Sequence, residues 1–170
     1  MALGWADDEQ EEQMDAEAVA TALEREHREI DEGIATFVAG LAVGERDPKP
    51  LLRAVVALRR HIYLEEEFLF PPLRAAGLIA PVFVMVREHG RMWRTLDKLD
   101  TELARRIVPA SVVDLLQDLQ DQLQAHNPKE EQILYPQADQ VLTSAATAEL
   151  RALLDTEWFP DGWVCVAVRP

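Results

Sequence analysis

The sequence predicts an all-α protein, specifically an up-down-up-down antiparallel four-helix bundle with a short C-terminal extension. Apolar residues recur every three or four positions in four long stretches, which is the period of an amphipathic helix. Short loops join these stretches, and short connections make neighbouring helices run antiparallel. The segment HIYLEEEFLFP at 61–71 also recurs as HNPKEEQILYP at 126–136. This repetition indicates a duplicated helical hairpin.

The first two predicted helices form the first hairpin. One runs from about residue 15 to near residue 44, with apolar side chains at the helical period. The other follows Pro50, and its predicted inward-facing residues include Leu52 and Val56. Pro71 should kink or end this second helix, because proline lacks a backbone N–H and its ring clashes with the carbonyl four residues back.

The next two predicted helices form the second hairpin. After a turn at Gly77, the third helix continues until just before Pro109. Ser111 is the predicted N-cap of the fourth helix, since its hydroxyl can accept from the free N–H groups of the first turn. Pro128 lies inside the fourth helix and should bend it, because it removes the backbone hydrogen bond to residue 124.

The two ends of the chain lie outside the bundle, which is predicted to span residues 14–142. Residues 1–13 are acidic and polar, so a mobile tail is expected there. Residues 143–170 are expected to form a C-terminal helix and tail that pack on the bundle, with the helix from Thr143 to Asp155. The final EWFPDGWVCVAVRP segment contains a Val/Cys/Val alternation, which favours a strand or a clamp over a helix.

Composition limits the classes of protein to which the chain can belong. Its 170 residues include 17 basic and 31 acidic side chains, which give a net charge of -14. This charge repels phosphate backbones and anionic lipid, so neither nucleic acid nor a membrane is expected as a partner. Cys165 cannot form an internal disulfide, and no secretory leader or membrane span is recognisable. A cytoplasmic location is therefore expected.

All four histidines of the chain belong to the repeat, in which a lone histidine precedes a His-x3-Glu unit twice. Residues four apart share a helical face, so each unit can direct an imidazole and a carboxylate at one point. At about 1.5 Å per residue, distances to the connecting loops place these side chains within a turn or two of one level. Four nitrogens and two carboxylates exceed a closed tetrahedral zinc site and suit two bridged iron or manganese ions. The candidate metal ligands are His27, His61, Glu65, His89, His126 and Glu130.

These motifs resemble the hemerythrin-like proteins, also called the HHE cation-binding domain, over residues from about 24 to 140. The similar features are a histidine on the first helix, His-x3-Glu with Leu-Phe-Pro on the second, Glu-His on the third, and His-x3-Glu-Glu with Leu-Tyr-Pro on the fourth. The resemblance implies that His27 and His61 hold one iron, that His89 and His126 hold the other, and that Glu65 and Glu130 bridge them.

The chain departs from the family pattern in two places. Oxygen-carrying hemerythrins have a second histidine four residues along the third helix, where this chain has Trp93. With two imidazoles on each ion, both ions could keep an open position, which suits oxygen or peroxide chemistry more than reversible carriage. Pro128 could rotate the bridging role from Glu130 to Glu131, but the repeat pairs Glu130 with Glu65 and so favours Glu130.

Other polar and aromatic residues near the motifs have simpler interpretations. Glu66 and Glu67 are expected on a solvated helix face, as a charge run usually is. Asp31 stands four residues after a histidine, where it is either a spare ligand or, by preference, an exposed charge. Trp93 is expected to pack in the core and is also a candidate to line the site. Cys165 is expected to be an inert buried thiol.

Two classes of function fit this pattern. The first is a non-haem dinuclear iron protein that binds O2 or reacts with peroxide, with manganese or a mixed Fe/Mn centre as the alternative to two iron ions. The second is a metal- or O2-sensing module, or an iron-storage module, that acts through a partner protein. A sensor would usually carry an attached output domain, and only about thirty residues lie beyond the predicted bundle, which favours the first class.

Overall fold

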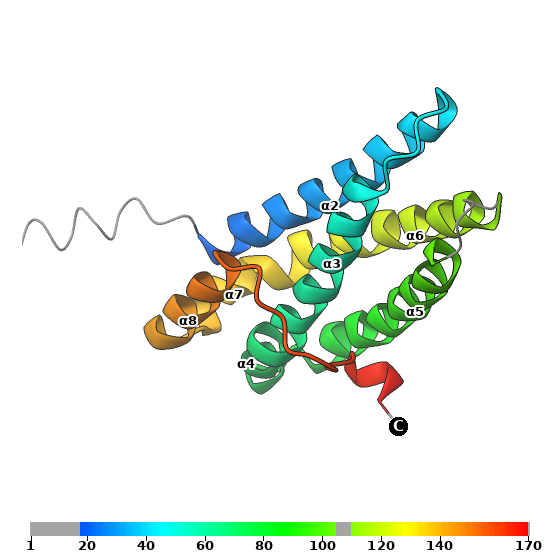
Figure 1. Cartoon of the computed structure of the whole chain (residues 1–170). Helices are drawn as coiled ribbons and strands as arrows, with labels where there is room; N and C mark the ends of the chain where they lie inside the picture. Colours follow the sequence, from blue (N-terminus) through cyan, green and yellow to red (C-terminus); the bar gives the residue numbers. More distant parts are fainter. Residues whose placement is uncertain (1–17, 105–109, 170) are drawn as a thin grey trace, which may run out of the picture.

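A computed structural model describes residues 18–104 and 110–169, and every regular element within them is helical (Figure 1). The elements are α2 (Val19–Ala42), α3 (Lys49–Leu64), η1 (Glu65–Leu69), α4 (Phe70–Ala75), α5 (Ile79–Leu103), α6 (Ala110–Lys129), η2 (Glu130–Leu134), α7 (Tyr135–Val141), α8 (Ser144–Leu154) and η3 (Val166–Val168). The all-α prediction is confirmed for this part of the chain. The tail predicted for residues 1–13 and the helix end predicted at Pro109 lie outside the described residues.

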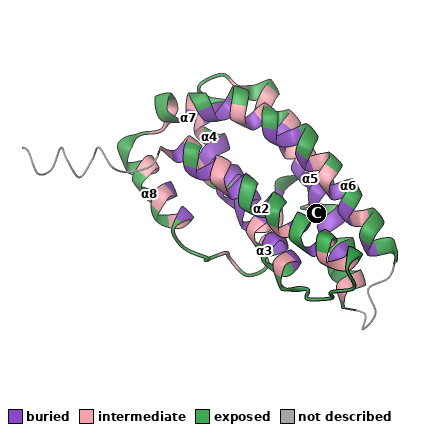
Figure 2. Cartoon of the chain, turned by 90° about the horizontal axis from the view of Figure 1, so that it is seen from above, coloured by how far each residue is buried: buried purple, intermediate pink, exposed green. Residues whose placement is uncertain are grey.

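The long helices pack in pairs, with α2 against α3 and α5 against α6, while α7 continues the line of α6 and contacts α2 (Figure 1). Seen from above, the buried faces of these helices turn towards one another (Figure 2). None of the helices in the described ranges is long and apolar enough to cross a membrane. The amphipathic period of the sequence therefore translates into faces that are buried against other helices.

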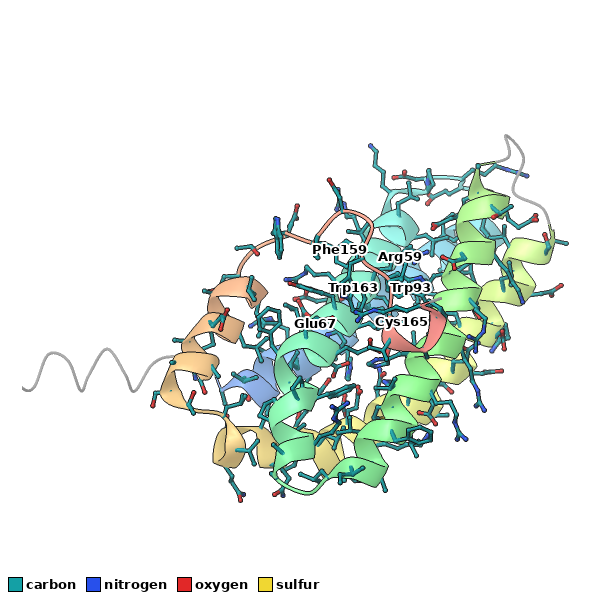
Figure 3. All side chains as sticks on the ribbon, turned by 90° about the horizontal axis from the view of Figure 1, so that it is seen from below. Arg59, Glu67, Trp93, Phe159, Trp163 and Cys165 are labelled. Carbon is teal, nitrogen blue, oxygen red and sulfur yellow. The ribbon has the colours of Figure 1, made fainter. Side chains whose placement is uncertain are left out.

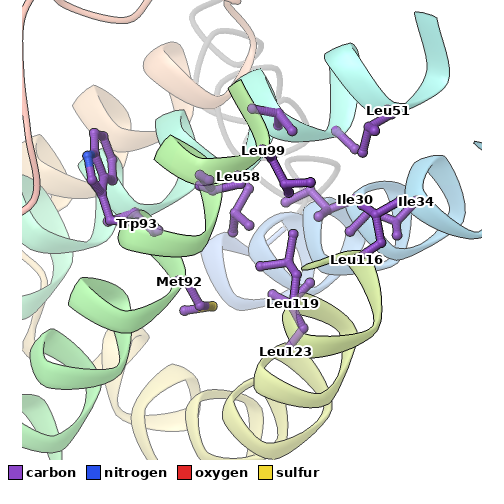
Figure 4. Packing of buried hydrophobic residues seen from close by; sticks show 14 of the residues in the cluster. Ile30, Ile34, Leu51, Leu58, Met92, Trp93, Leu99, Leu116, Leu119 and Leu123 are labelled. Carbon is purple, nitrogen blue, oxygen red and sulfur yellow. The ribbon is translucent and has the colours of Figure 1, made fainter. Parts of the chain in front are cut away.

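Two apolar clusters make up the core of the part of the chain that the structure describes. One contains Ile30, Ile34, Leu58, Leu96 and Leu116 with their neighbours (Figure 4), and the other contains Leu23, Leu64, Leu69, Val82 and Leu134 with theirs. On α2 and α5 a histidine lies between the residues of one cluster and those of the other, and His126 lies between Leu123 of the first cluster and Leu134 of the second. On α3, His61 stands beside this boundary, which falls after Ile62. The histidines thus form a polar layer with apolar packing on both sides.

Residues that typically end or cap helices do so at two places in the structure, but the predicted N-cap does not. Gly77 ends α4 with a positive φ of 101°, and the N–H groups of residues 77 and 78 donate to the carbonyls of Arg74 and Leu73, which closes a Schellman motif. The hydroxyl of Thr143 caps α8 by accepting from the N–H of residue 146 at 3.2 Å. The N-cap prediction for Ser111 is wrong, because this residue lies inside α6 and its hydroxyl donates to Glu102 instead.

A π-helical turn follows each His-x3 segment, as η1 and η2. The N–H of Phe70 bonds the carbonyl of Glu65, and the N–H of Tyr135 bonds the carbonyl of Glu130, so both bonds span five residues. A proline stands two residues beyond the end of each turn, as Pro71 and Pro136, and a proline ring would collide with the carbonyl four residues back in an α-helix. Widening the preceding turn relieves this collision and keeps the chain helical. Such turns often occur at functional sites.

Two core predictions on α3 were wrong. Leu52 and Val56 are exposed, and they line a surface pocket of about 520 Å³ between α3 and the end of α8. Leu51 and Ala54 take the buried positions instead. The buried face continues through Val55 and Leu58, which were predicted correctly, so Leu52 and Val56 lie beside this face and not on it.

The strand predicted in the C-terminal segment is absent from the described residues. After α8 the chain crosses α3 in an irregular path and reaches α5, where η3 forms a short 3-10 turn (Figure 1). Cys165 is fully buried, and the ring of Trp163 packs on those of Trp93 and Tyr63. The alternation of this segment reflects contact with helices rather than pairing with another strand.

Candidate metal centre

Six side chains from the polar layer meet in two overlapping groups. The first group is His27, His61, Glu65 and Glu130; the second group is Glu65, His89, His126 and Glu130. Within each group the possible ligand atoms all lie within 4.8 Å of one another. The structure therefore brings together all six candidate ligands from the sequence, and no two of the four histidines share a helix.

The two shared carboxylates each face both groups. Glu65 places Oε1 3.5 Å from Nε2 of His61 and Oε2 3.2 Å from Nε2 of His89. Glu130 repeats this arrangement, with Oε2 3.4 Å from an imidazole Nε2 of the first group and Oε1 3.0 Å from one of the second. Each carboxylate thus offers one oxygen to each group, which is the geometry that a bridging ligand requires.

Burial makes this cluster unfavourable without a cation. Glu65, Glu130 and His89 are completely buried, and the other three histidines are nearly so. Glu65 Oε2, Glu130 Oε1 and His89 Nε2 have no hydrogen-bond partner among the described residues. A buried polar atom without a partner costs about 1–3 kcal/mol, and more if it is charged. A metal ion between these atoms would satisfy all three, so the side chains fit such an ion.

The other ring nitrogen of every histidine faces a second carboxylate. These Nδ1–carboxylate pairs are His27–Glu131 at 2.9 Å, His61–Glu26 at 2.8 Å, His89–Glu66 at 2.9 Å and His126–Glu88 at 3.0 Å. An Nδ1–H that donates to a carboxylate orients the ring and leaves the Nε2 lone pair free for a metal. We call Glu26, Glu66, Glu88 and Glu131 the outer carboxylates.

The outer carboxylates follow the internal repeat. Glu26 and Glu88 each precede a histidine in an Arg-Glu-His sequence, and Glu66 and Glu131 each follow a shared carboxylate in a Glu-Glu sequence. From the sequence, Glu131 was considered only as an alternative bridging ligand, and Glu26, Glu66 and Glu88 had no predicted role at the centre. The expectation that Glu66 lies on a solvated face was wrong, because Glu66 is buried against His89.

Charge counting indicates what the centre can hold. The two shared and four outer carboxylates bring six negative charges into or beside the polar layer. Arg60 bonds Glu26 and Lys129 bonds Glu88, so two of these charges are offset. With neutral imidazoles four negative charges remain, which matches the charge of two divalent cations.

In the metal-free protein, protons on the histidines balance part of this negative charge. Burial alone would lower the pKa of His61, but the carboxylates of Glu65 and Glu26 outweigh burial and raise it to about 10. The pKa of His89 is raised in the same way: burial alone would lower it, but the surrounding carboxylates of Glu130, Glu65 and Glu66 outweigh burial. Burial and repulsion from Glu130 oppose ionisation of Glu65, yet the imidazoles hold its pKa below the usual range. Protons and metal ions therefore compete for the same nitrogen atoms.

Tyr135 belongs to the centre and was missed as a site residue. Its hydroxyl lies 3.1 Å from Nε2 of His27 and 3.2 Å from Nε2 of His61, and it donates to Glu65 Oε1 at 2.8 Å. Burial, together with the nearby carboxylates, raises the pKa of Tyr135, which keeps the phenol protonated. The repeat offered a signal, because Tyr135 replaces Phe70 at the equivalent position.

This replacement makes the two groups unequal. Phe70 stacks on His89 with ring centroids 5.4 Å apart, and Tyr135 stacks on His27 at 5.6 Å. The rings thus have equivalent places, but only the first group receives a hydroxyl. A phenol among the Nε2 atoms can donate a proton or a hydrogen bond there, whereas a phenyl ring cannot.

The alternative ligand candidates lie in different positions. Glu130 belongs to both groups, whereas Glu131 bonds Nδ1 of His27 as an outer carboxylate. Asp31 is exposed and belongs to neither group, in agreement with its preferred interpretation.

Trp93 packs under the C-terminal segment. Its ring is 5.4 Å from that of Trp163, and the Arg59 guanidinium lies 4.5 Å above it (Figure 3). These contacts agree with the expected packing role. They direct the ring towards the covering segment and give no support to the suggestion that Trp93 lines the site.

Comparison with known proteins identifies one family. A family model for the hemerythrin HHE cation-binding domain matches residues 18–138, which is well over half of the chain. Searches among curated proteins and among solved structures gave no match. The matched region contains all six residues of the two groups, all four outer carboxylates and Tyr135, and it ends before α8.

Proposed function

Because the chain belongs to the hemerythrin HHE cation-binding domain family, we propose that it is a non-haem protein with a dinuclear iron centre. One ion would lie between His27 and His61 and the other between His89 and His126, with manganese or a mixed centre as the alternative. The proposal also keeps the antiparallel, up-down-up-down arrangement of the four long helices, which short connections favour.

The observation that carries this proposal is the position of the shared carboxylates. Glu65 and Glu130 each direct one oxygen towards the first group and one towards the second. In a site for one ion, a second pair of histidines with its own outer carboxylates would be unexplained. The four excess negative charges also support two divalent ions rather than one.

The proposed activity is binding of O2 or reaction with peroxide. Each group offers four residues as ligands, fewer than the six positions of an octahedral ion. Iron bound there would supply redox chemistry and a position open to a small molecule. The protein excludes bulk water through the apolar clusters on both sides of the layer. Tyr135 holds a proton at its hydroxyl, within hydrogen-bond distance of the first group.

The metal content of the purified protein tests the dinuclear proposal. We expect about two iron ions per chain after anaerobic reconstitution with Fe(II), because the two groups are complete and share their bridging carboxylates. Elemental analysis combined with protein quantification measures this ratio. A ratio of one or less after full reconstitution would contradict the proposal and indicate a mononuclear site.

A Tyr135→Phe variant tests the role of the hydroxyl. In the metal-free protein its loss removes a partner from four buried side chains, His27, His61, Glu65 and Glu130, which should cost about 1–3 kcal/mol. Metal-bound Nε2 atoms no longer need that partner, so the metal-loaded protein should lose less. The rise in melting temperature on metal binding should therefore be larger in Tyr135→Phe than in the wild type.

Calorimetry of the metal-free and metal-loaded forms of each protein measures this rise. Tyr63→Phe is the control, because Tyr63 packs in an aromatic cluster beside the C-terminal segment. An equal or smaller rise would show that the hydroxyl supports the metal-loaded state as much as the metal-free one.

A further inference from the structure

The C-terminal region, residues 143–169, follows the part of the chain that matches the family model, yet two of the four outer carboxylates depend on it. We propose that this region is a positioning element of the metal centre, which holds one histidine of each group through its own chain of hydrogen bonds. This inference rests on the proposed function, since it assigns the region a role at the same centre.

The first chain of hydrogen bonds runs through Arg60, which is buried and reaches from α3 to the end of α8. The acceptors of its Nη1 are the carbonyl oxygens of Leu153, Leu154 and Thr156, at 3.0, 3.4 and 2.6 Å. Its Nη2 donates to Glu26, whose other oxygen pairs with Nδ1 of His61 at 2.8 Å. Because a guanidinium is planar and rigid, the carbonyl contacts fix the direction in which Arg60 presents Nη2. We call this the Arg60 link.

The second chain runs through the backbone of η3. The N–H of Val166 donates to Glu66 Oε2 at 2.7 Å, and Glu66 Oε1 pairs with Nδ1 of His89 at 2.9 Å. Both bonds are short, and Glu66 is buried, so a charge-assisted pair of this kind is strong and well oriented. We call this the Val166 link.

The C-terminal segment packs closely against α5 at the Val166 link. A Cβ added to Gly90 would lie 2.6 Å from Cβ of Ala167, so only glycine beside His89 allows η3 to approach α5 this closely. Glu67 adds anchors on the same side by accepting from Nε1 of Trp163 at 2.8 Å and from Arg169 at 2.7 Å (Figure 3). The Val166 link is therefore held in place by the packing of the whole segment.

The remaining outer carboxylates have different surroundings. Glu88 accepts from Lys129 at 2.6 Å, within the family-matched part of the chain. The Glu131 side chain is 35% exposed. The C-terminal region thus supports His61 in the first group and His89 in the second, so each metal position has one histidine whose orientation depends on it.

The decisive variant is Val166→Pro, which removes the N–H of the Val166 link. The backbone tolerates proline here, because Cys165 has ψ of 151° and residue 166 is the first of the 3-10 turn. The Val166 side chain is 46% exposed, so its loss matters little, and Val166→Ala is the matched control that keeps the N–H. Loss of a residue that hydrogen-bonds a metal ligand typically weakens metal binding 10- to 100-fold. The Val166 N–H bonds Glu66 and not His89 itself, so we expect a loss of about 10-fold.

The measurement is anaerobic titration of the full-length protein with Fe(II) in competition with a coloured chelator. Wild type and Val166→Ala should bind two ions with the same two affinities, and Val166→Pro should bind one of them about 10-fold more weakly. Gly90→Ala should do the same by displacing η3, although alanine is the better helix former. Arg60→Lys should weaken the other ion, whereas Arg59→Lys, which alters an exposed pair with Asp97 and Asp100, should weaken neither.

The outcomes separate the two proposals. A wild-type chain that binds fewer than two ions would contradict the proposed function. A wild-type chain with two ions, together with Val166→Pro and Gly90→Ala variants of unchanged affinity, would overturn the present inference alone. Weakening that also occurs in Val166→Ala would do the same, because it would trace the effect to the side chain and not to the N–H.

Discussion

Replacing Glu65 by glutamine should abolish stable binding of both ions of the proposed dinuclear centre, because this residue directs an oxygen to each of the two groups. A glutamine has nearly the same shape but brings no charge, and its amide nitrogen is a donor that cannot bind a cation. Replacing His27 by alanine should instead remove a ligand from the first group only. The two variants therefore distinguish a shared carboxylate from a ligand of one position.

The expected effect on stability is large. An ion present at about 1,000 times its Kd stabilises the folded state by about 4 kcal/mol, so two ions contribute roughly 8 kcal/mol. At about 2–4 °C per kcal/mol for a chain of this size, metal should raise the melting temperature of the wild type by roughly 20 °C. In Glu65→Gln this rise should be lost, and elemental analysis should find less than one ion per chain.

Glu67→Gln is the matched control, since residue 67 lies two positions along the same turn and its side chain points to Trp163 and Arg169. The amide oxygen of glutamine can still accept from both Trp163 and Arg169, so the C-terminal segment should remain in place. This control should keep both ions and the full rise in melting temperature. If Glu65→Gln also kept two ions, Glu65 would not be a bridging ligand.

The sequence was sufficient to predict the long helices and to select six side chains that the structure brings together, for a physical reason. A buried helical face imposes a period of three to four residues on the apolar side chains. A centre whose candidate ligands come from four helices imposes a fixed spacing between histidine and glutamate within each repeat. Both constraints are periodic, so they remain visible along the chain. The spacing of His61 and Glu65 predicts that their side chains share a face, and the structure places them in one group.

The outer carboxylates could not be assigned from spacing, because each reaches a histidine on another helix. Glu66 pairs with His89, which is 23 residues away, and Glu131 pairs with His27, which is 104 residues away. On its own helix a run of glutamates is typical of a solvated face. The repeat aligns Glu66 with Glu131, which indicates that this position matters in both copies. It does not indicate which histidine either glutamate contacts.

Tyr135 and the C-terminal segment were missed for different reasons. The hydroxyl of Tyr135 reaches the first group because η2 widens the helix, so that positions five apart share a face, and periodicity arguments assume an α-helix. The C-terminal segment has the alternation of a strand, but the described residues offer it no strand to pair with. Its donors instead bond Glu66 and Glu67 on η1.

Stability of the metal-free protein should fall as the pH rises from about 6.5 to 10. The pKa of His61 is raised to about 10 in the folded protein, and those of His89 and His126 are also raised. A group whose pKa is raised by folding stabilises the folded state fully below its unfolded value of about 6.5. That contribution is lost as the pH rises through the folded value, because the buried carboxylates then lose their protonated partners.

The shared carboxylates limit the stability of the metal-free protein at acidic pH. Their pKa values are lowered by the imidazoles, so their contribution is present above about 4.5 and is lost as the pH falls through the folded values. Metal-free protein should therefore be most stable between about pH 4.5 and 6.5. This window would not exist if the histidines were neutral in the absence of metal.

Metal should remove the loss of stability on the alkaline side. A bound ion replaces the Nε2 protons and does not leave as the pH rises, so the metal-loaded protein should keep its melting temperature where the metal-free protein loses it. The gain from metal should accordingly grow between pH 6.5 and 8.5, and protons should be released on binding in weakly buffered solution at pH 7. Calorimetry across this range, with a pH indicator during titration, measures both effects. A metal-free melting temperature that does not fall above pH 6.5, together with binding that releases no protons, would show that the imidazoles are already neutral and that the carboxylates do not hold protons on them.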